Sequence, residues 1–253
     1  MGTPHSKGIR SAIKPAAKRD PKGNKQAIMD AALEEFARYG FGGSRIDEIA
    51  RDTNTSKRMI YYYFGNKRGL HRAVVLDAVK SVQFLTNNLR THYDDPVHEF
   101  AVRVDAALTW AEENPLKLRL LTTENQYPDG ESELIEGVNA DISAAIVGYF
   151  REPFAYGQSL GSIRSGPDAP SIMEVYQVAI SLALMRIEHH FSMKTLHGHD
   201  IFSASSRLDQ HGLIIETLLR LIVVEPSQAE RYVQQVLTDS QPPENPKWPE
   251  DLV

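Results

Sequence analysis

The side chains best suited to chemistry in this sequence lie between residues 44 and 67, where they combine positive charge with hydroxyl groups. Cationic and hydroxyl side chains are the groups that contact phosphate oxygens and base edges in duplex DNA. Three consecutive tyrosines add aromatic bodies whose hydroxyls can reach phosphates. The candidate DNA-contacting residues are Ser44, Arg45, Thr55, Ser56, Lys57, Arg58, Tyr61, Tyr62, Tyr63 and Lys67.

A helix-turn-helix has to position these residues if they are to reach DNA, and their spacing predicts one. Ser44 is expected to cap a short helix, with Asp47 three positions further on. The turn falls at residues 53–56, where Asn54 tolerates a left-handed backbone. A second short helix is expected over residues 57–63, and such a helix fits the major groove of B-DNA.

A longer helix should precede this unit and complete a three-helix head, and another long helix should follow it. The first is expected to begin at Asn24, a good capping residue, and to run to Tyr39, with Gly40 as its stop. The second should start at about Lys67 and continue towards Arg90. Its first turn would close the head.

The distribution of charge supports a polyphosphate partner for the N-terminal part of the chain. The whole chain has a net charge of −5. Residues 1–72 hold 15 Lys and Arg against 7 Asp and Glu, while the remainder holds 13 against 26. Residues 1–22 are the most basic segment, and we interpret them as a flexible arm, either solvated or lying along the minor groove.

The rest of the chain is expected to be helical, with no strand and no internal repeat. Apolar residues recur at helical spacing after Pro96 and up to Asn114, and another helix follows towards Gln126. Further helices are expected over residues 134–150, 172–191, 208–224 and 229–237, with loops rich in Gly and Pro between some of them. The fold class is therefore all-α.

Composition narrows the possible locations and chemistries. The chain has no cysteine, which excludes disulfides and thiolate chemistry. No apolar run follows the basic N-terminus as in a secretory signal. The apolar stretch 213–224 contains Glu216 and Arg220 and is too short to span a bilayer. These features predict a cytoplasmic protein that has no membrane partner.

The residues of the predicted head also follow a specific pattern at several fixed spacings over about 50 residues. It consists of Asn24–Ala32, Phe36, Gly40–Phe41, Ile46–Ala50, Ser56–Phe64, Lys67 and Leu70. This pattern resembles the head of the tetracycline-repressor (TetR) family of transcriptional regulators. Arg58 and Met59 depart from the Gly-Thr pair that is common in the family, so no operator sequence can be carried over.

The resemblance implies roles for the candidate DNA-contacting residues. It implies that Ser44 and Arg45 touch phosphates at the start of the second helix. Four residues are assigned to the groove, namely Thr55, Lys57, Arg58 and Tyr62, with Ser56 beside them. Tyr61, Tyr63 and Lys67 are assigned to the DNA backbone, although one of the three tyrosines, either Tyr63 or Tyr61, should face the core.

The resemblance also implies a homodimer that binds a small-molecule effector and needs no cofactor. The helices at 172–191 and 208–224 would pair with their copies, and the middle helices would enclose the effector. The candidate ligand-binding residues are Trp110, Asn125, Tyr127, Tyr149, Phe150, Phe154, Met185 and His189, each of which could instead be a packing residue. The implied domains are the arm 1–22, a DNA-binding domain 23–70, an effector-binding and dimerisation domain 71–240, and a Pro-rich tail 241–253.

The sequence leaves alternatives to a ligand-released repressor. Histidines gather between residues 189 and 211, but without a His-Glu-x-x-His frame or cysteines we expect no metal site. No phosphate-binding Gly loop, nucleophile elbow or carboxylate pair is present, so we expect no enzyme. The remaining alternatives are an all-helical binding module that no longer reads DNA, and an activator of the same fold.

Overall fold

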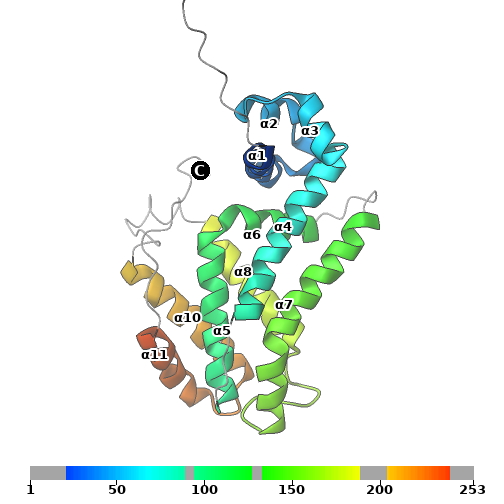
Figure 1. The fold of residues 1–253 in the computed structure, drawn as a ribbon. Coiled ribbons are helices and arrows are strands. Elements are labelled where there is room, and N and C mark those ends of the chain that lie inside the picture. The colour runs from blue at the N-terminus through cyan, green and yellow to red at the C-terminus, as the bar shows by residue number, and fades with distance from the viewer. Residues whose placement is uncertain (1–20, 89–93, 127–132, 189–203, 240–253) are drawn as a thin grey trace, which may run out of the picture.

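The computed structural model describes residues 21–88, 94–126, 133–188 and 204–239 of the chain. In these ranges every regular element is a helix, apart from an isolated antiparallel bridge between Ile163 and Val223. The predicted all-α class is confirmed (Figure 1). In chain order the elements are α1 (Pro21–Gly43), α2 (Ile46–Asp52), α3 (Lys57–Phe64), α4 (Lys67–Asn88), α5 (Pro96–Glu113), α6 (Pro115–Gln126), α7 (Glu133–Ser159), α8 (Ile172–Glu188), α10 (Ala204–Ile222), the 3-10 turn η1 (Pro226–Gln228) and α11 (Ala229–Asp239).

Helices α1, α2 and α3 form a small head, which α4 joins to the rest of the molecule (Figure 1). Short helices such as α2 and α3 are marginal in isolation, so packing has to hold them. Burying one large apolar side chain contributes roughly 1.5–3 kcal/mol. The head core includes the fully buried side chains of Ile28, Phe36, Ile49, Ile60 and Leu70.

Three residues with positive φ shape the helix ends in the head, and one of them is Gly65 (φ 79°) at the end of α3. Gly40 has φ 65°, which interrupts α1 where the sequence predicts its stop, although a last helical segment runs on to Gly43. Asn54 has φ 47°, the left-handed conformation predicted for the turn. The expected start of α1 at Asn24 is wrong, because the helix begins at Pro21, a residue well suited to the first helical position.

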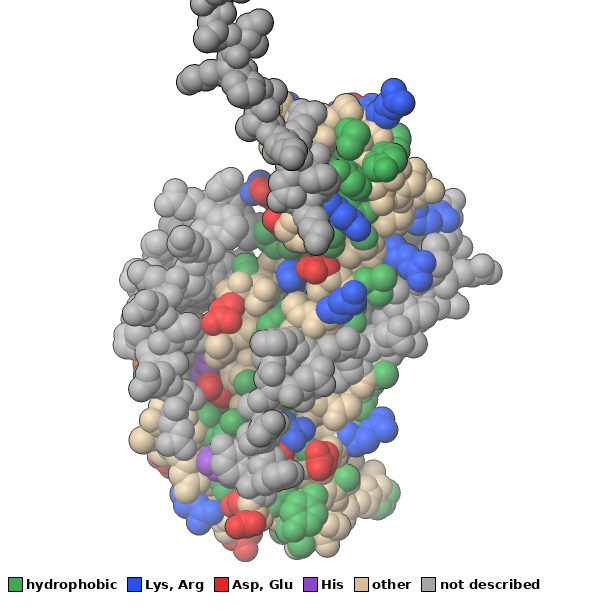
Figure 2. All heavy atoms as spheres, in the orientation of Figure 1, with side chains coloured by type: hydrophobic (Ala, Val, Ile, Leu, Met, Phe, Trp, Pro, Cys, Tyr) green, Lys and Arg blue, Asp and Glu red, His purple; other side chains and the backbone are tan. Residues whose placement is uncertain are grey.

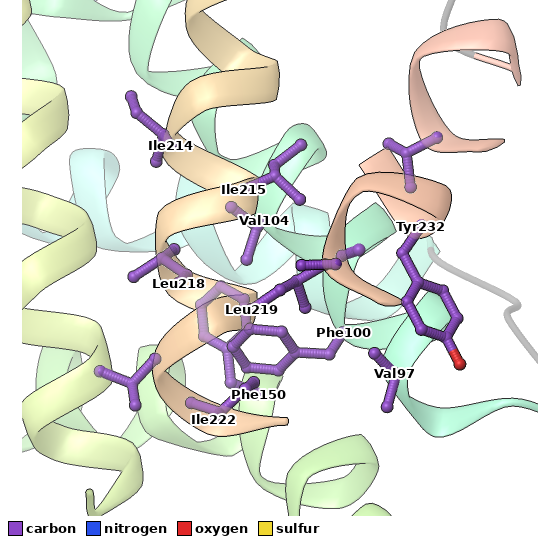
Figure 3. Packing of buried hydrophobic residues seen from close by; sticks show 14 of the residues in the cluster. Val97, Phe100, Val104, Phe150, Ile214, Ile215, Leu218, Leu219, Ile222 and Tyr232 are labelled. Atoms are coloured by element: carbon purple, nitrogen blue, oxygen red, sulfur yellow. The ribbon is translucent and has the colours of Figure 1, made fainter. Parts of the chain in front are cut away.

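The body is built around α5, which contacts α7, α10 and α11. Asp95 caps α5 by accepting hydrogen bonds from the backbone N–H groups of Val97 (3.0 Å) and His98 (3.3 Å). The same carboxylate accepts a bond of 2.9 Å from the Tyr232 hydroxyl of α11. Figure 3 shows the apolar side chains that meet between these helices, among them Phe100, Val104, Phe150, Ile214, Ile215, Leu218, Leu219 and Ile222.

Helix α7 is longer than the sequence suggests. It was expected to end at Phe150 but continues through Pro153 to Ser159. A proline inside a helix leaves the carbonyl four residues earlier without its N–H partner. That carbonyl belongs to Tyr149, and the buried Arg103 guanidinium of α5 donates a hydrogen bond to it. A side chain 46 positions away in sequence therefore supplies the missing donor.

The remaining boundaries differ by a few residues. Helix α8 begins at Ile172 as expected, and the expected end at Phe191 lies outside the described residues. Helix α10 begins at Ala204 rather than Leu208. The predicted domain boundary between residues 70 and 71 falls inside α4. The arm 1–22 and the tail 241–253 lie outside the described ranges, except that residues 21 and 22 belong to α1.

Candidate DNA-reading helix and ligand cavity

Helix α3 presents a polar, aromatic surface to solvent. The Ser56 hydroxyl caps it by accepting a hydrogen bond of 3.3 Å from the Met59 N–H. On the inner side Ile60 is fully buried. On the outer side Tyr62 is 78% exposed and Tyr61 is 42% exposed. Figure 2 shows Lys and Arg side chains beside hydrophobic ones on this end of the molecule.

The charged side chains at the start of α3 differ in their partners. Lys57 and Arg58 are both exposed. Lys57 Nζ lies 2.6 Å from Asp47 Oδ1 of α2, an ion pair between solvent-exposed side chains. Arg58 has no ion pair within the described part of the chain. Its guanidinium is therefore available to an external acceptor, and a guanidinium can bond a guanine edge or a phosphate with two N–H groups.

The structure corrects the expectation for Ser44. Its side chain is buried, and the hydroxyl donates a hydrogen bond of 3.0 Å to the Phe41 carbonyl. Helix α2 begins only at Ile46, and the residue at its cap position is Arg45, which makes no side-chain cap bond. The Arg45 backbone N–H instead donates to Glu35 of α1 at 2.8 Å. Ser44 thus holds the loop together, and its hydroxyl is not exposed for a phosphate.

Lys67 is engaged inside the head. Its Nζ donates a hydrogen bond of 2.6 Å to the Ser44 carbonyl and lies 4.9 Å from the centre of the Phe41 ring. Partial burial lowers the pKa of Lys67, and the nearby Glu35 carboxylate opposes that shift. The ammonium therefore braces the loop before α2 against α4, and its contact with the DNA backbone stays a prediction.

The three consecutive tyrosines divide between core and surface. Tyr63 is half-buried and packs against the head core, whereas Tyr61 and Tyr62 are exposed. Their distribution agrees with the expectation that one of the three faces inward. The half-buried Thr55 precedes the Ser56 cap, so both residues lie at the start of α3.

A cavity lies in the body between α4, α5, α6, α7 and α8. The centre of a water molecule can occupy about 90 Å³ of this cavity. One bound water needs roughly 10–15 Å³ by the same measure, so the cavity has room for a larger molecule. Three of the predicted ligand-binding residues line it, namely Trp110, Tyr149 and Phe150.

Helix α6 separates this cavity from the head. Leu118 and Leu121 of α6 line the cavity, while Leu120 and Leu121 belong to the head core. Lys117 of α6 also pairs with Asp77 of α4 at 3.0 Å. Helix α6 also packs against α1. A displacement of α6 by a molecule in the cavity would therefore act directly on the head.

The comparisons with known proteins identify this architecture. Residues 28–74 match the family model described as bacterial regulatory proteins, tetR family. The chain is 34% identical over 159 residues to the HTH-type transcriptional repressor SCO4008 of Streptomyces coelicolor. This match covers 62% of this chain and 76% of that protein. The chain belongs to the TetR family. It is a DNA-binding transcriptional regulator.

A second relative resembles the chain in sequence, and a solved structure resembles it in fold. The HTH-type transcriptional repressor NicS of Pseudomonas putida is 28% identical over 195 residues, which cover 76% of this chain and 89% of that protein. Among solved structures, a TetR-family regulatory protein from Rhodococcus RHA1 aligns with a TM-score of 0.56, at 19% identity, over 85% of this chain and 95% of that one. Regulators of the TetR family bind DNA operators and form dimers.

The other predicted ligand-binding residues of this TetR-family chain do not line the cavity in the described part of the structure. Phe154 is buried in the body core but is not part of the cavity wall. Met185 is 58% exposed on α8 and is not part of the described cavity wall, so its role in ligand binding stays a prediction. The side chain of Asn125, together with Tyr127 and His189, lies outside the described residues.

Most of the cavity wall was missed because it consists of small and aliphatic residues that look like packing residues. Four of the five wall residues on α5, and all four on α8, follow the same spacing of i, i+3, i+4 and i+7. That spacing places four side chains on one helix face and is the signal that could have found them. The wall residues without a prediction are Val82, Val104, Ala107, Leu108, Ala111, Leu118, Leu121, Thr122, Tyr176, Ala179, Ile180 and Ala183.

A buried histidine joins α10 to the back of α5. His211 Nδ1 lies 2.7 Å from Asp105 Oδ1, and His211 Nε2 lies 3.0 Å from Glu112 Oε1. A neutral imidazole has one N–H and cannot donate to two ionised carboxylates, so with both carboxylates ionised this geometry calls for the imidazolium. Burial lowers the pKa of His211, but the bonds and charges of Asp105 and Glu112 outweigh it and raise the pKa above its ordinary value.

Two searches of the described residues bear on other classes of function. No helix among them is both long and apolar enough to cross a membrane. Within the same ranges no group of three His, Cys, Asp or Glu side chains is arranged to hold a metal ion. Of the histidines between residues 189 and 211, only His211 is described.

Proposed function

We propose that this TetR-family protein represses transcription by binding its operator as a homodimer, and that a small molecule in the body cavity releases it. The observation that carries this proposal is the position of α6, which lines the cavity with Leu118 and contributes Leu120 to the head core. The proposed activity needs neither a cofactor nor a catalytic residue. It places the protein in the cytoplasm with the DNA that it reads.

DNA reading is assigned to α3. The exposed Arg58 and Tyr62 face away from the buried Ile60 and can reach a major groove together with Lys57 and Thr55. A well-placed bidentate Arg contact discriminates between bases by about 1–3 kcal/mol. Arg58 is therefore the side chain expected to contribute most to sequence preference.

Dimerisation is assigned to α8 and α10, which pack against each other. On the outside of this pair several large apolar side chains are exposed, including Met185 (58%) on α8 and Leu213 (64%) and Leu221 (41%) on α10. Exposed apolar surface on adjacent elements is typical of a protein interface. A dimer is also needed to read two half-sites about 34–36 Å apart, or a multiple of that distance.

Release is assigned to a shift between two conformations. A ligand that fits the cavity better when α6 is displaced from α1 would favour a state with the heads misplaced for DNA. Coupling of this kind is typically worth about 1–3 kcal/mol, which weakens operator binding roughly 5- to 150-fold.

Selection of bound duplexes from a random pool, followed by binding titrations, tests the proposal. Arg58→Ala should lose preference for the selected duplex, while Arg151→Ala, an exposed arginine of α7 in the body, should keep it. Equal behaviour of the two variants would contradict the assignment of α3.

Light scattering tests the dimer separately. Leu213→Asp should convert the dimer to a monomer, whereas Leu160→Asp, which replaces an exposed leucine just after α7, should leave it intact. A wild-type monomer that still bound the operator tightly would contradict the proposed dimer.

A further inference from the structure

Among the described residues that line the cavity, none has a charged side chain. Its surface is formed by aliphatic side chains such as Val104, Leu108 and Ile180, together with aromatic ones such as Trp110 and Phe150. Moving an ionised group from water into such surroundings is strongly unfavourable unless a partner charge receives it. The cavity therefore discriminates against anions and cations.

Four side chains with a polar group belong to the described part of the wall, and two of these groups already have hydrogen-bond partners. The Thr122 hydroxyl donates to backbone carbonyls of its own helix, at 2.9 Å to Leu118. The Tyr149 hydroxyl donates to the Arg103 carbonyl at 3.3 Å. Neither the Tyr176 hydroxyl nor the buried Trp110 Nε1–H has a hydrogen-bond partner in the described part of the chain.

Two further properties of Tyr176 and its neighbours define the ligand. Burial raises the pKa of Tyr176, so the phenol is neutral and carries a proton that it can donate. Aromatic side chains stand on three of the surrounding helices, with Trp110 on α5, Tyr149 and Phe150 on α7 and Tyr176 itself on α8. Aromatic rings stack favourably on one another in offset or edge-on arrangements.

We infer that the effector is a neutral, compact aromatic molecule with few polar groups, and that one of these groups bonds to the Tyr176 hydroxyl. The inference rests on the proposed release function, because it names the class of ligand for the same cavity. Apolar cavities of this kind stay dry and take up small apolar molecules. One hydrogen bond to Tyr176 then orients the ligand.

Three probes that share a naphthalene frame test the chemistry: 1-naphthol, naphthalene and 1-naphthoate, the last an anion at neutral pH. The chain has two tryptophans, Trp110 and Trp248, so Trp248→Phe leaves Trp110 in the cavity wall as the only indole reporter. Of the three probes, we expect 1-naphthol to change the fluorescence of Trp110 at the lowest concentration. 1-Naphthoate should bind at least a hundredfold more weakly, and anion binding equal to or tighter than 1-naphthol would overturn the inference.

Tyr176→Phe in the same background tests the hydrogen bond. It removes only the hydroxyl, so we expect affinity for 1-naphthol to fall about two- to tenfold while affinity for naphthalene stays the same. An equal change for both probes would overturn the role of Tyr176.

Ala183→Leu fills part of the cavity and should abolish binding of 1-naphthol, whereas Ala155→Leu adds the same bulk at an exposed site of α7 and should leave binding unchanged. Binding that survives Ala183→Leu would place the probe elsewhere and overturn the inference.

Operator binding measured with saturating 1-naphthol separates this inference from the proposed function. Loss of operator binding supports both. Binding of 1-naphthol in the cavity without release supports the ligand chemistry and contradicts release through this cavity by such a ligand. Release by 1-naphthoate but not by 1-naphthol would overturn the ligand chemistry and leave the release function standing.

Discussion

The buried His211 should give the protein a pH-dependent stability that a single substitution removes. The folded state raises the pKa of His211 above its value of 6.5 in a model peptide, through Asp105 and Glu112. The stabilisation is therefore complete below that unfolded value and is lost as the pH rises through the folded pKa. The protein should become less stable on the alkaline side of pH 6.5.

The magnitude follows from the geometry. One proton is retained by the folded state between the two pKa values, so the free energy of unfolding should fall by about 1.36 kcal/mol per pH unit there. His211→Gln removes the positive charge that faces the partly buried Asp105 and the buried Glu112. Breaking a buried ion pair in this way costs about 3–5 kcal/mol.

Urea unfolding of wild type and His211→Gln over a pH series, at one protomer concentration, measures both effects. A fixed concentration matters because dimerisation contributes to stability. The variant should be less stable near neutral pH and should lose the alkaline slope that is due to His211. If the two proteins show parallel pH profiles, the imidazolium between Asp105 and Glu112 is not present and the reasoning fails.

Three further substitutions test local features. Arg103→Met should destabilise the protein by about 3–5 kcal/mol. The cost should be smaller in a Pro153→Ala background, because the restored N–H of residue 153 can bond to the Tyr149 carbonyl. Additive costs in a double-mutant cycle would refute this coupling. Lys67→Met should lower the free energy of unfolding by about 1 kcal/mol even without DNA, and an unchanged value would show that the ammonium does not brace the head. Asn54→Val should cost about 1–2 kcal/mol in thermal unfolding because φ is positive, while Asn54→Gly should be tolerated.

The head was predictable because its signals are local. Turn chemistry at Asn54 and the apolar stripe that includes Ile46 and Ile49 specify short elements within a few residues. The exception is Ser44, a good capping residue by type. The structure buries its hydroxyl against the Phe41 carbonyl, because the loop after Gly40 folds back before α2 begins.

The body was less predictable because its decisive contacts join distant positions. The α5 stripe from Val104 to Ala111 is visible in the sequence, but whether it faces a neighbour or a void depends on where α8 lies. His211 meets Asp105 across 106 residues, and no local pattern indicates that pairing. The continuation of α7 through Pro153 depends in the same way on Arg103.

The central claim is that α3 enters a groove of duplex DNA with Arg58 and its neighbours. Competition binding measures it most directly: a labelled selected duplex is titrated at several salt concentrations against unlabelled selected and scrambled duplexes. The account predicts that the selected duplex competes far better at moderate ionic strength, and that log affinity falls linearly with log salt at a slope of about −0.9 per phosphate contacted. Equal competition by both duplexes at every salt concentration would contradict it.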